Sequence, residues 1–531
     1  MKKQNFFPLL CLCLMMLLPL LCPLAVRADD LSEAPGGTVT DTASLISALG
    51  GSQTAFVSST GYVTLSRDVR LTAPLFLESG SFELHGGGCV LTIADGASII
   101  VQGGAHLQLG SAQTRTTTDD LILSAKNRTD GQAMIRVEKG GSLLIEVGTV
   151  LEETKAGPAL KNLGEAAMNS GAFRNCFSPM GGAIVNHGSL FLLGGTITVK
   201  DSTEIIPEHG GAIWNNGSIV LSGTVISGTR AVCGGGIWND ETGSVTLYDG
   251  AITECTASEK GGGIYNKGTV TQNGGHIDSN TAEQGGGIYN TGVYEAPSGS
   301  LSKNQAVLGG GVYNEGTITL SGVSSTMCSA EEKGGAVYQT ETGTISYRPG
   351  SSIDFPSAKY GGGIFSLGTL TVSGGGISGA KAELGSAIFN AGTLILSDSA
   401  YIEKKSEVFQ LVTDSVSPIL LKTRLTPPRV MTLTFGTEKD GAYQTGASDG
   451  SVLLSPGEGA SFDVTQFPFS DSLAKRYALA SDGTLKNIKS SLPLPLWIGI
   501  GALGAALIAL AAFGIVRRSP KKKKGESEDH A

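Results

Sequence analysis

A short glycine-rich phrase of the form Gly-Gly-Gly-Ile-Tyr-Asn recurs nine times between residues 181 and 390. Successive copies are 24 to 29 residues apart. The aliphatic position of the phrase is held by Ile184, Ile213, Ile237, Ile264, Ile288, Val312, Val337, Ile364 and Ile388. A fixed period in this range is typical of stacked supersecondary units that share one core. The repeat therefore predicts one elongated body rather than a string of globular domains.

Each repeat has the pattern of three short strands joined by turns. In the copy from 261 to 284, the alternating runs 263–266, 269–271 and 276–279 are separated by Lys-Gly, Asn-Gly-Gly and Ala-Glu-Gln-Gly. Such runs have strand length, and the separators are turn residues. Three strands per coil, each paired with the same strand of the next coil, form a parallel β-helix that rises ~4.8 Å per coil. Like residues of successive copies should then lie in columns.

Asparagine dominates the third column of the phrase. Its members are Asn186, Asn215, Asn239, Asn266, Asn290, Asn314 and Asn390, with Gln339 and Ser366 as interruptions. Stacked amides can donate and accept along the axis, which satisfies a turn where backbone pairing lapses. We expect a structural ladder; the alternative is a row of amides that binds a ligand.

The second column of the phrase is aromatic. It comprises Trp214, Trp238, Tyr265, Tyr289, Tyr313, Tyr338, Phe365 and Phe389. Strand alternation directs these rings to the face opposite the aliphatic column. One hypothesis is an outward stripe of rings that binds sugars or another protein. The other is that the rings stack on one another and cover the glycine-rich backbone.

The five cysteines that follow residue 28 form no metal-binding pattern and no CxxC. Cys176, Cys255 and Cys328 fall in a further column, shared with asparagine and threonine. Cysteine there is expected to act as a compact hydrophobe. Cys255 and Cys328 are three coils apart, ~14 Å on the inter-strand spacing, too far for a disulfide.

Both ends of the chain carry membrane signals. A basic start, an apolar run and small residues before Asp29 predict a signal peptide over 1–28. Residues 494–516 carry no charge and are long enough to span a bilayer. The basic segment 517–531 follows, which places it in the cytoplasm and the preceding body outside. The lysines at 521–524 fit a stop-transfer signal, with a lipid-specific site as the alternative.

These observations define the predicted organisation. The helical pattern at 41–51 predicts a short cap helix, because an exposed end of a β-helix must be covered. The predicted segments are a signal peptide (1–28), an N-terminal cap with degenerate coils (29–130), the repeat domain (131–405), a C-terminal β cap (406–486), a linker with the transmembrane helix (487–516) and a basic tail (517–531).

The phrase Gly-Gly-Gly-Ile-Tyr-Asn-x-Gly-Thr-x-Thr, with Asn-x-Ala after it, spans 261 to 282. It resembles the repeats of bacterial surface proteins with a right-handed, pectin-lyase-like β-helix, and is similar to the Gly-Gly-Ala-Ile repeat of the polymorphic outer-membrane adhesins. The resemblance covers about 130–405 well and 38–130 loosely. It implies an all-β, right-handed, single-stranded parallel β-helix, a fold that hosts both polysaccharide-cleaving enzymes and adhesins.

The residues favour binding over catalysis. The resemblance implies that enzymes of this fold would show clustered carboxylates with an Arg or Lys base, or paired aspartates with Gly-His-Gly and Arg-Ile-Lys phrases. Neither phrase occurs here. We expect no enzymatic activity, no cofactor and no metal. A charge of -9 also argues against nucleic acid as a partner.

The sequence therefore predicts a membrane-anchored cell-surface β-helix that binds an extracellular glycan or protein, in the manner of an adhesin. The alternatives are an unrecognised polysaccharide lyase or glycoside hydrolase, and a structural spacer that binds nothing.

Overall fold

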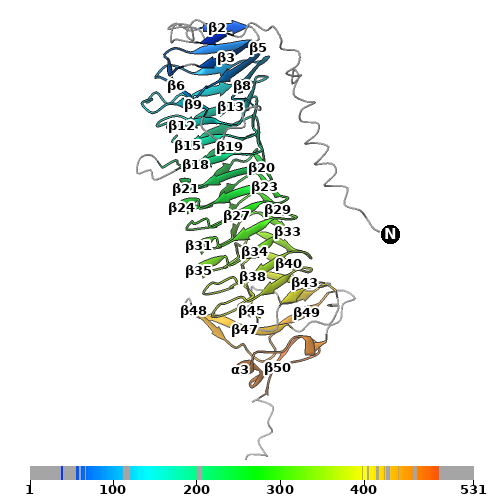
Figure 1. The fold of residues 1–531 in the computed structure, drawn as a ribbon. Helices are drawn as coiled ribbons and strands as arrows, with labels where there is room; N and C mark the ends of the chain where they lie inside the picture. Colours follow the sequence, from blue (N-terminus) through cyan, green and yellow to red (C-terminus); the bar gives the residue numbers. More distant parts are fainter. Residues whose placement is uncertain are drawn as a thin grey trace, which may run out of the picture.

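In the computed structural model, the chain forms a right-handed parallel β-solenoid of about 14 turns (Figure 1). The structure describes residues 37–39, 55–58, 61–65, 67–111, 120–199, 206–397, 399–402, 406–413, 418–423, 425, 431–439, 442–457 and 463–488. Two short helices lie within these ranges, η2 (Val464–Gln466) and α3 (Asp471–Ala474). The predicted all-β parallel solenoid is confirmed.

Several predicted segments lie outside the described residues. They are the signal peptide (1–28), the cap helix (41–51), the apolar segment (494–516) and the basic tail (517–531). Across the ranges that are described, no helix is both long and apolar enough to cross a bilayer.

Each coil contributes strands to three stacked files. The first file carries the repeated phrase and comprises β2 (Ala55–Ser58), the start of β5 (Leu75–His85), β7 (Ile99–Val101), β10 (Ile135–Val137), β13 (Leu160–Asn162), β16 (Ile184–Asn186), β19 (Ile213–Asn215), β22 (Ile237–Asn239), β25 (Ile264–Asn266), β28 (Ile288–Asn290), β32 (Val312–Asn314), β36 (Val337–Gln339), β39 (Ile364–Ser366), β42 (Ile388–Asn390), β45 (Glu407–Leu411) and β47 (Thr432–Lys439). The second file comprises β1 (Gly37–Val39), β3 (Gly61–Leu65), the end of β5, β8 (Ala105–Leu109), β11 (Ser142–Ile145), β14 (Glu165–Met168), β17 (Ser189–Leu192), the starts of β20 (Ser218–Ser227) and β23 (Ser244–Thr253), β26 (Thr269–Gln272), β29 (Val293–Ala296), β33 (Thr317–Leu320), β37 (Thr344–Tyr347), β40 (Thr369–Val372), β43 (Thr393–Leu396), β46 (Ile419–Leu421) and β49 (Leu454–Pro456). The third file comprises β4 (Val69–Leu71), β6 (Cys89–Ile93), β9 (Leu121–Ser124), β12 (Thr149–Glu152), β15 (Ala172–Arg174), β18 (Thr196–Thr198), the ends of β20 and β23, β27 (His276–Asp278), β30 (Ser300–Ser302), β34 (Ser324–Thr326), β38 (Ser352–Asp354), β41 (Gly376–Ser378) and β44 (Tyr401–Ile402).

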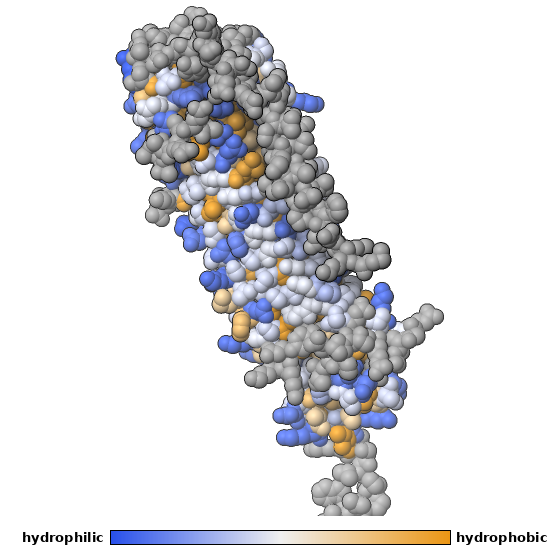
Figure 2. All heavy atoms as spheres, turned by 45° about the vertical axis from the view of Figure 1, so that its right-hand side comes forward, coloured by the Kyte–Doolittle hydropathy of each residue, from blue (hydrophilic) through white to orange (hydrophobic). Residues whose placement is uncertain are grey.

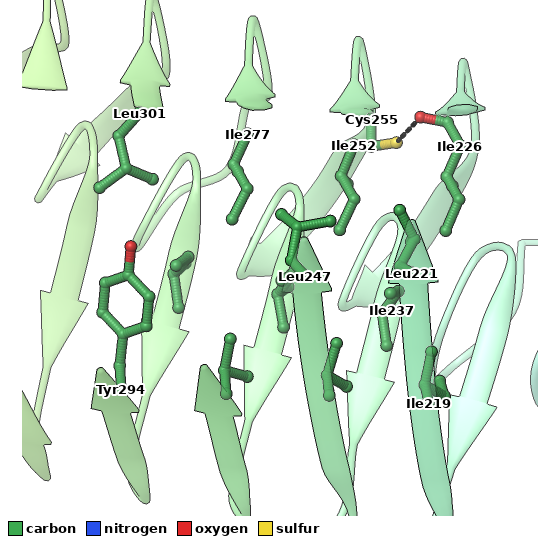
Figure 3. Packing of buried hydrophobic residues seen from close by; sticks show 14 of the residues in the cluster. Ile219, Leu221, Ile226, Ile237, Leu247, Ile252, Cys255, Ile277, Tyr294 and Leu301 are labelled. Atoms are coloured by element: carbon green, nitrogen blue, oxygen red, sulfur yellow. Dashed lines mark hydrogen bonds between the residues drawn. The ribbon is translucent and has the colours of Figure 1, made fainter. Parts of the chain in front are cut away.

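Aliphatic side chains from all three files meet inside the coil. Ile264, Val270 and Ile277, one from each file of a single coil, are each no more than 1% exposed. Their counterparts in neighbouring coils lie directly in line, as Ile226, Ile252 and Ile277 do in Figure 3. A single coil cannot bury its own apolar side, so the core exists only because the coils stack.

The glycines of the phrase turn the chain into the first file. Gly285 has a φ of +66°, which L side chains rarely adopt. A Cβ on the following Gly286 would collide with the carbonyl oxygens of Gln305 and Gly310 in the next coil. The first glycine is thus required by backbone conformation and the second by close approach.

A small buried ladder follows the third file. Asn280 Nδ2 donates to the Ile252 carbonyl at 2.9 Å, and Asn304 Nδ2 donates to the Ile277 carbonyl at 2.8 Å. Cys255 and Cys328 occupy the equivalent slot and are fully buried. Both are free thiols, so they fill this position as compact hydrophobes, as predicted.

Residues beyond 405 continue the solenoid before it ends. Strand β45 pairs in parallel with β42, and β47 pairs in parallel with β45. The end is built from antiparallel pairs: β48 (Ala442–Thr445) folds back on β47, and β50 (Tyr477–Leu479) pairs with β51 (Leu485–Asn487). Two shorter parallel pairs lie where the chain passes from the third file of one coil to the first file of the next. They are β21 (Arg230–Cys233) with β24 (Thr256–Lys260), and β31 (Gln305–Leu308) with β35 (Ser329–Lys333).

Candidate functional site

The asparagine column forms a hydrogen-bonded ladder on the inner side of the turn that follows the first file. Each Nδ2 from Asn186 to Asn290 donates to the Oδ1 of the next coil at 2.7–2.8 Å. The ladder begins one coil earlier at Asn162, which the repeated phrase does not include. It ends with Asn390 donating to Gln410. Every member is fully buried or nearly so, which leaves no amide surface for a ligand.

The ladder also closes the turn of each coil. Asn266 Nδ2 donates to the Val293 carbonyl at 2.9 Å as well as to Asn290 Oδ1 at 2.7 Å. Where Gln339 interrupts the column, its Nε2 donates to the carbonyls of Gly343 and Thr369. Ser366 donates to Gln339 Oε1 at 3.1 Å. Gln339 therefore keeps the two kinds of carbonyl bond that Asn239 makes at the equivalent turn, to Gly243 and Thr269.

The aromatic column lies on the side of the first file that faces away from the core, as strand alternation requires. From Trp238 to Phe409 the rings stack continuously, with centroids 4.1 Å apart at Trp238–Tyr265 and 5.5 Å apart at Tyr338–Phe365. Trp214 packs instead against His187, at 5.0 Å. These rings form a second hydrophobic cluster, separate from the core.

A further row of side chains covers this aromatic stripe. It lies four residues before each aliphatic position, and its members pair in register along the axis. We call it the cover row: Met180, His209, Cys233, Lys260, Gln284, Leu308, Lys333, Tyr360 and Leu384.

Members of the cover row lie over the ring of the following coil. Lys260 Nζ is 4.7 Å from the centroid of the Tyr289 ring, and Lys333 Nζ is 5.1 Å from that of Phe365. Because ring faces contact one another and their edges lie beneath the cover row, no ring of the stripe is more than 8% exposed. The stripe offers no free aromatic face on which a sugar could stack.

Polar groups at the edge of the stripe differ along its length. Tyr289 donates its hydroxyl to Glu315 Oε1 at 2.6 Å. Burial raises the pKa of Tyr265 and of Tyr313 to about 12, so both phenols stay protonated at neutral pH. In contrast, Trp238 Nε1 and His209 Nδ1 are buried without a hydrogen-bond partner.

The C-terminal hairpin closes the stripe. Tyr443 of β48 packs edge-on against Tyr360 at 5.1 Å and lies 4.7 Å from Phe389. The rings at this end, Phe365 and Phe389, are fully buried. The stripe thus behaves as a packed layer with a closed end.

The second file presents a flat outer surface that the sequence analysis did not single out. We call it the hydroxyl face: Ser244, Thr246, Thr269, Thr271, Thr317, Thr319, Thr344, Ser346, Thr369 and Thr371. One coil, with Val293 and Glu295, interrupts it. The alternation Gly-Thr-x-Thr was the available signal, but it is also what strand propensity alone produces.

The hydroxyl face is available to solvent. Thr269, Thr317 and Thr344 are exposed, and the remaining members are half-buried. Within the described ranges, no side-chain hydroxyl of this face has a protein hydrogen-bond partner. Figure 2 brings forward the edge on which Figure 1 labels β29, β33, β40 and β43, and the surface over the middle coils there is pale, neither strongly hydrophilic nor hydrophobic.

The described histidines make separate local contacts: His85 Nε2 lies 3.2 Å from Glu83 Oε2, and His106 Nδ1 lies 2.7 Å from Ser142 Oγ. His276 Nδ1 lies 2.7 Å from Ser300 Oγ, whereas His187 and His209 pack on tryptophan rings. Among the described residues, no three His, Cys, Asp or Glu side chains are grouped so as to hold a metal ion.

Comparison of the chain with protein families, with curated proteins and with solved structures found no match in any of the three.

Replacing Asn266 with Ala is expected to lower the stability of the solenoid by about 1–3 kcal/mol, because the change leaves buried donors and acceptors unpaired. The midpoint of urea unfolding, followed by circular dichroism, measures this loss. Asn273→Ala, at a half-buried turn of the same coil, is the matched control and should leave the midpoint nearly unchanged. Equal midpoints for the two variants would contradict a stabilising role for the ladder.

Phe365→Ala is expected to cost roughly 3–5 kcal/mol, the range for removal of a buried aromatic side chain. Its ring is fully buried and stacked on both sides. Phe355→Ala removes the same ring from a position that is 64% exposed and should have little effect. Thermal unfolding compares the two, and a Phe365→Ala protein as stable as Phe355→Ala would show that the stripe does not stabilise the fold.

Proposed function

We propose that the solenoid is a rigid rod, anchored in the membrane by residues 494–516, that displays the hydroxyl face to an extracellular glycan or glycosylated surface. The predicted signal peptide (1–28) and the predicted basic tail (517–531) are the sequence features that favour this orientation. The observation that carries the proposal is the in-register array of unpaired, solvent-accessible hydroxyls on the second file.

The geometry of the hydroxyl face suits a polysaccharide. Equivalent hydroxyls on successive strands are ~4.8 Å apart, and the two rows on each strand are separated by two residues, about 6.6 Å. Each hydroxyl can donate one hydrogen bond and accept others, which matches the hydroxyl groups of sugars. One such bond is weak, but a chain that engages several coils gains from their sum.

Rigidity is the second contribution of the fold. The hydroxyls are borne by strands whose opposite side chains, such as Val270 and Ile318, lie in the core at no more than 1% exposure. Because these strands are fixed on the inside, little conformational entropy is lost when the outer face binds. Binding by the rings is not favoured, since their faces are already occupied.

The test is retention of polysaccharides by the full chain, with the double variant Thr317→Val/Thr344→Val. Valine keeps the branched shape of threonine and removes two exposed hydroxyls on adjacent coils. At about 1 kcal/mol for each lost hydrogen bond, retention should weaken roughly 30-fold. The matched control is Thr256→Val/Thr281→Val, two exposed threonines that pair on the opposite corner of the rod.

Each outcome discriminates among the functions. Weakening in the first variant alone supports the proposal. Equal retention by both variants places binding elsewhere, and no retention by the unmodified chain favours a spacer. Shortening of the polysaccharide chains would instead support a lyase or hydrolase.

A further inference from the structure

Three soft donor side chains follow one another in the cover row. Met180, His209 and Cys233 belong to consecutive coils and pair in parallel register. The backbone ladder between them is intact, with Gly181 N donating to the His209 carbonyl at 2.9 Å and Gly210 N donating to the Cys233 carbonyl at 3.0 Å. In-register neighbours of a parallel sheet point to the same side, ~4.8 Å apart.

His209 and Cys233 are incompletely hydrogen-bonded. His209 Nδ1 is buried with no hydrogen bond. Among the described cysteines, the thiols of Cys89, Cys176, Cys255 and Cys328 each donate to a backbone carbonyl. The Cys233 sulfur accepts a hydrogen bond from the Lys260 backbone, but no donation by this thiol to a carbonyl is found in the described part of the chain. Buried polar atoms are normally paired, so the unpaired imidazole nitrogen of His209, in register with Cys233, indicates a missing occupant.

The surroundings orient the group. The His209 ring is stacked on Trp238 with centroids 3.9 Å apart and planes inclined by 24°. It therefore leans toward the level of Cys233, which lies in the same coil as Trp238. Cys233 itself is 8% exposed and belongs to the cluster of the aromatic stripe. Met180, on the other side of His209, is 42% exposed and gives access from solvent.

The spacing of His209 and Cys233 fits one shared ion. A bond of ~2.0–2.1 Å to imidazole nitrogen and one of ~2.3 Å to sulfur, as for a d10 ion, together span about 4.3 Å. That length is close to the ~4.8 Å between adjacent strands. Thiolate and thioether ligands with imidazole select monovalent copper over harder cations.

We propose that Met180, His209 and Cys233 form a binding site for a single soft monovalent cation of the Cu(I) class. Binding forms a bond from the ion to Cys233 sulfur, to His209 Nδ1 and to Met180 sulfur, and the Cys233 thiol releases one proton to solvent. No electron is transferred.

The experiment titrates the reduced full chain with Ag(I), a redox-inert probe of soft-donor sites, and follows tryptophan fluorescence. Since His209 is stacked on Trp238, binding should quench that ring with one equivalent of Ag(I). His209→Phe retains a ring on Trp238 but no donor atom, and Cys233→Ala removes the thiol. Each should weaken binding at least tenfold. Cys328→Ala, at a core thiol that donates to the Leu301 carbonyl, is the matched control and should bind as the unmodified chain does.

The outcomes are separable. Loss of the one-equivalent transition in His209→Phe and in Cys233→Ala, with Cys328→Ala unaffected, supports the site. The proposal is overturned by unchanged titration of the folded His209→Phe protein, by loss in Cys328→Ala alone, or by equal quenching with Zn(II). If Cys233→Ala does not fold, His209→Phe decides by itself, because the stacked ring that supports Trp238 remains.

Discussion

Parallel pairing in strict register is the constraint on which every other feature depends. Once Ile264 lies beside Ile288, their neighbours Tyr265 and Asn266 must lie beside Tyr289 and Asn290. A residue type that repeats in the sequence therefore becomes a column ~4.8 Å in spacing. The aliphatic column gives the core, the asparagine column gives a hydrogen-bonded ladder, and the aromatic column gives a continuous stack.

The same constraint explains how much the sequence could reveal. The core, the ladder and the stacking of rings follow from repeated residues, and all three could be read from the period and from strand alternation. The burial of the rings could not be predicted in this way. It depends on the cover row, whose members range from Met180 and Cys233 to Lys333 and Leu384 and so show no repeated chemistry. Only the fold shows that these unlike side chains occupy one column.

The hydroxyl face does repeat in the sequence, but its residues are ordinary strand residues and so did not indicate a binding surface. Thr269 and Thr271 fit a strand equally well whether their hydroxyls bind a ligand or only face solvent. Their position became informative when the structure placed both side chains on the outer side of the second file without a hydrogen-bond partner for either hydroxyl in the described part of the protein. In the same way, Tyr443 lies far along the chain from Tyr360, and no pattern in the sequence indicates that a hairpin closes the aromatic stripe.

Departures from the repeat are therefore the positions at which an otherwise uniform rod can form a single, localised site. A column of identical residues repeats one environment and gives no single site. The cover row instead places Met180, His209 and Cys233 together once, at the interval of 29 residues between Ile184 and Ile213, which is the longest between copies of the phrase. The backbone ladder holds them in register as firmly as any other residues, so the solenoid supplies a rigid frame in which one unrepeated combination of side chains can become a specific site.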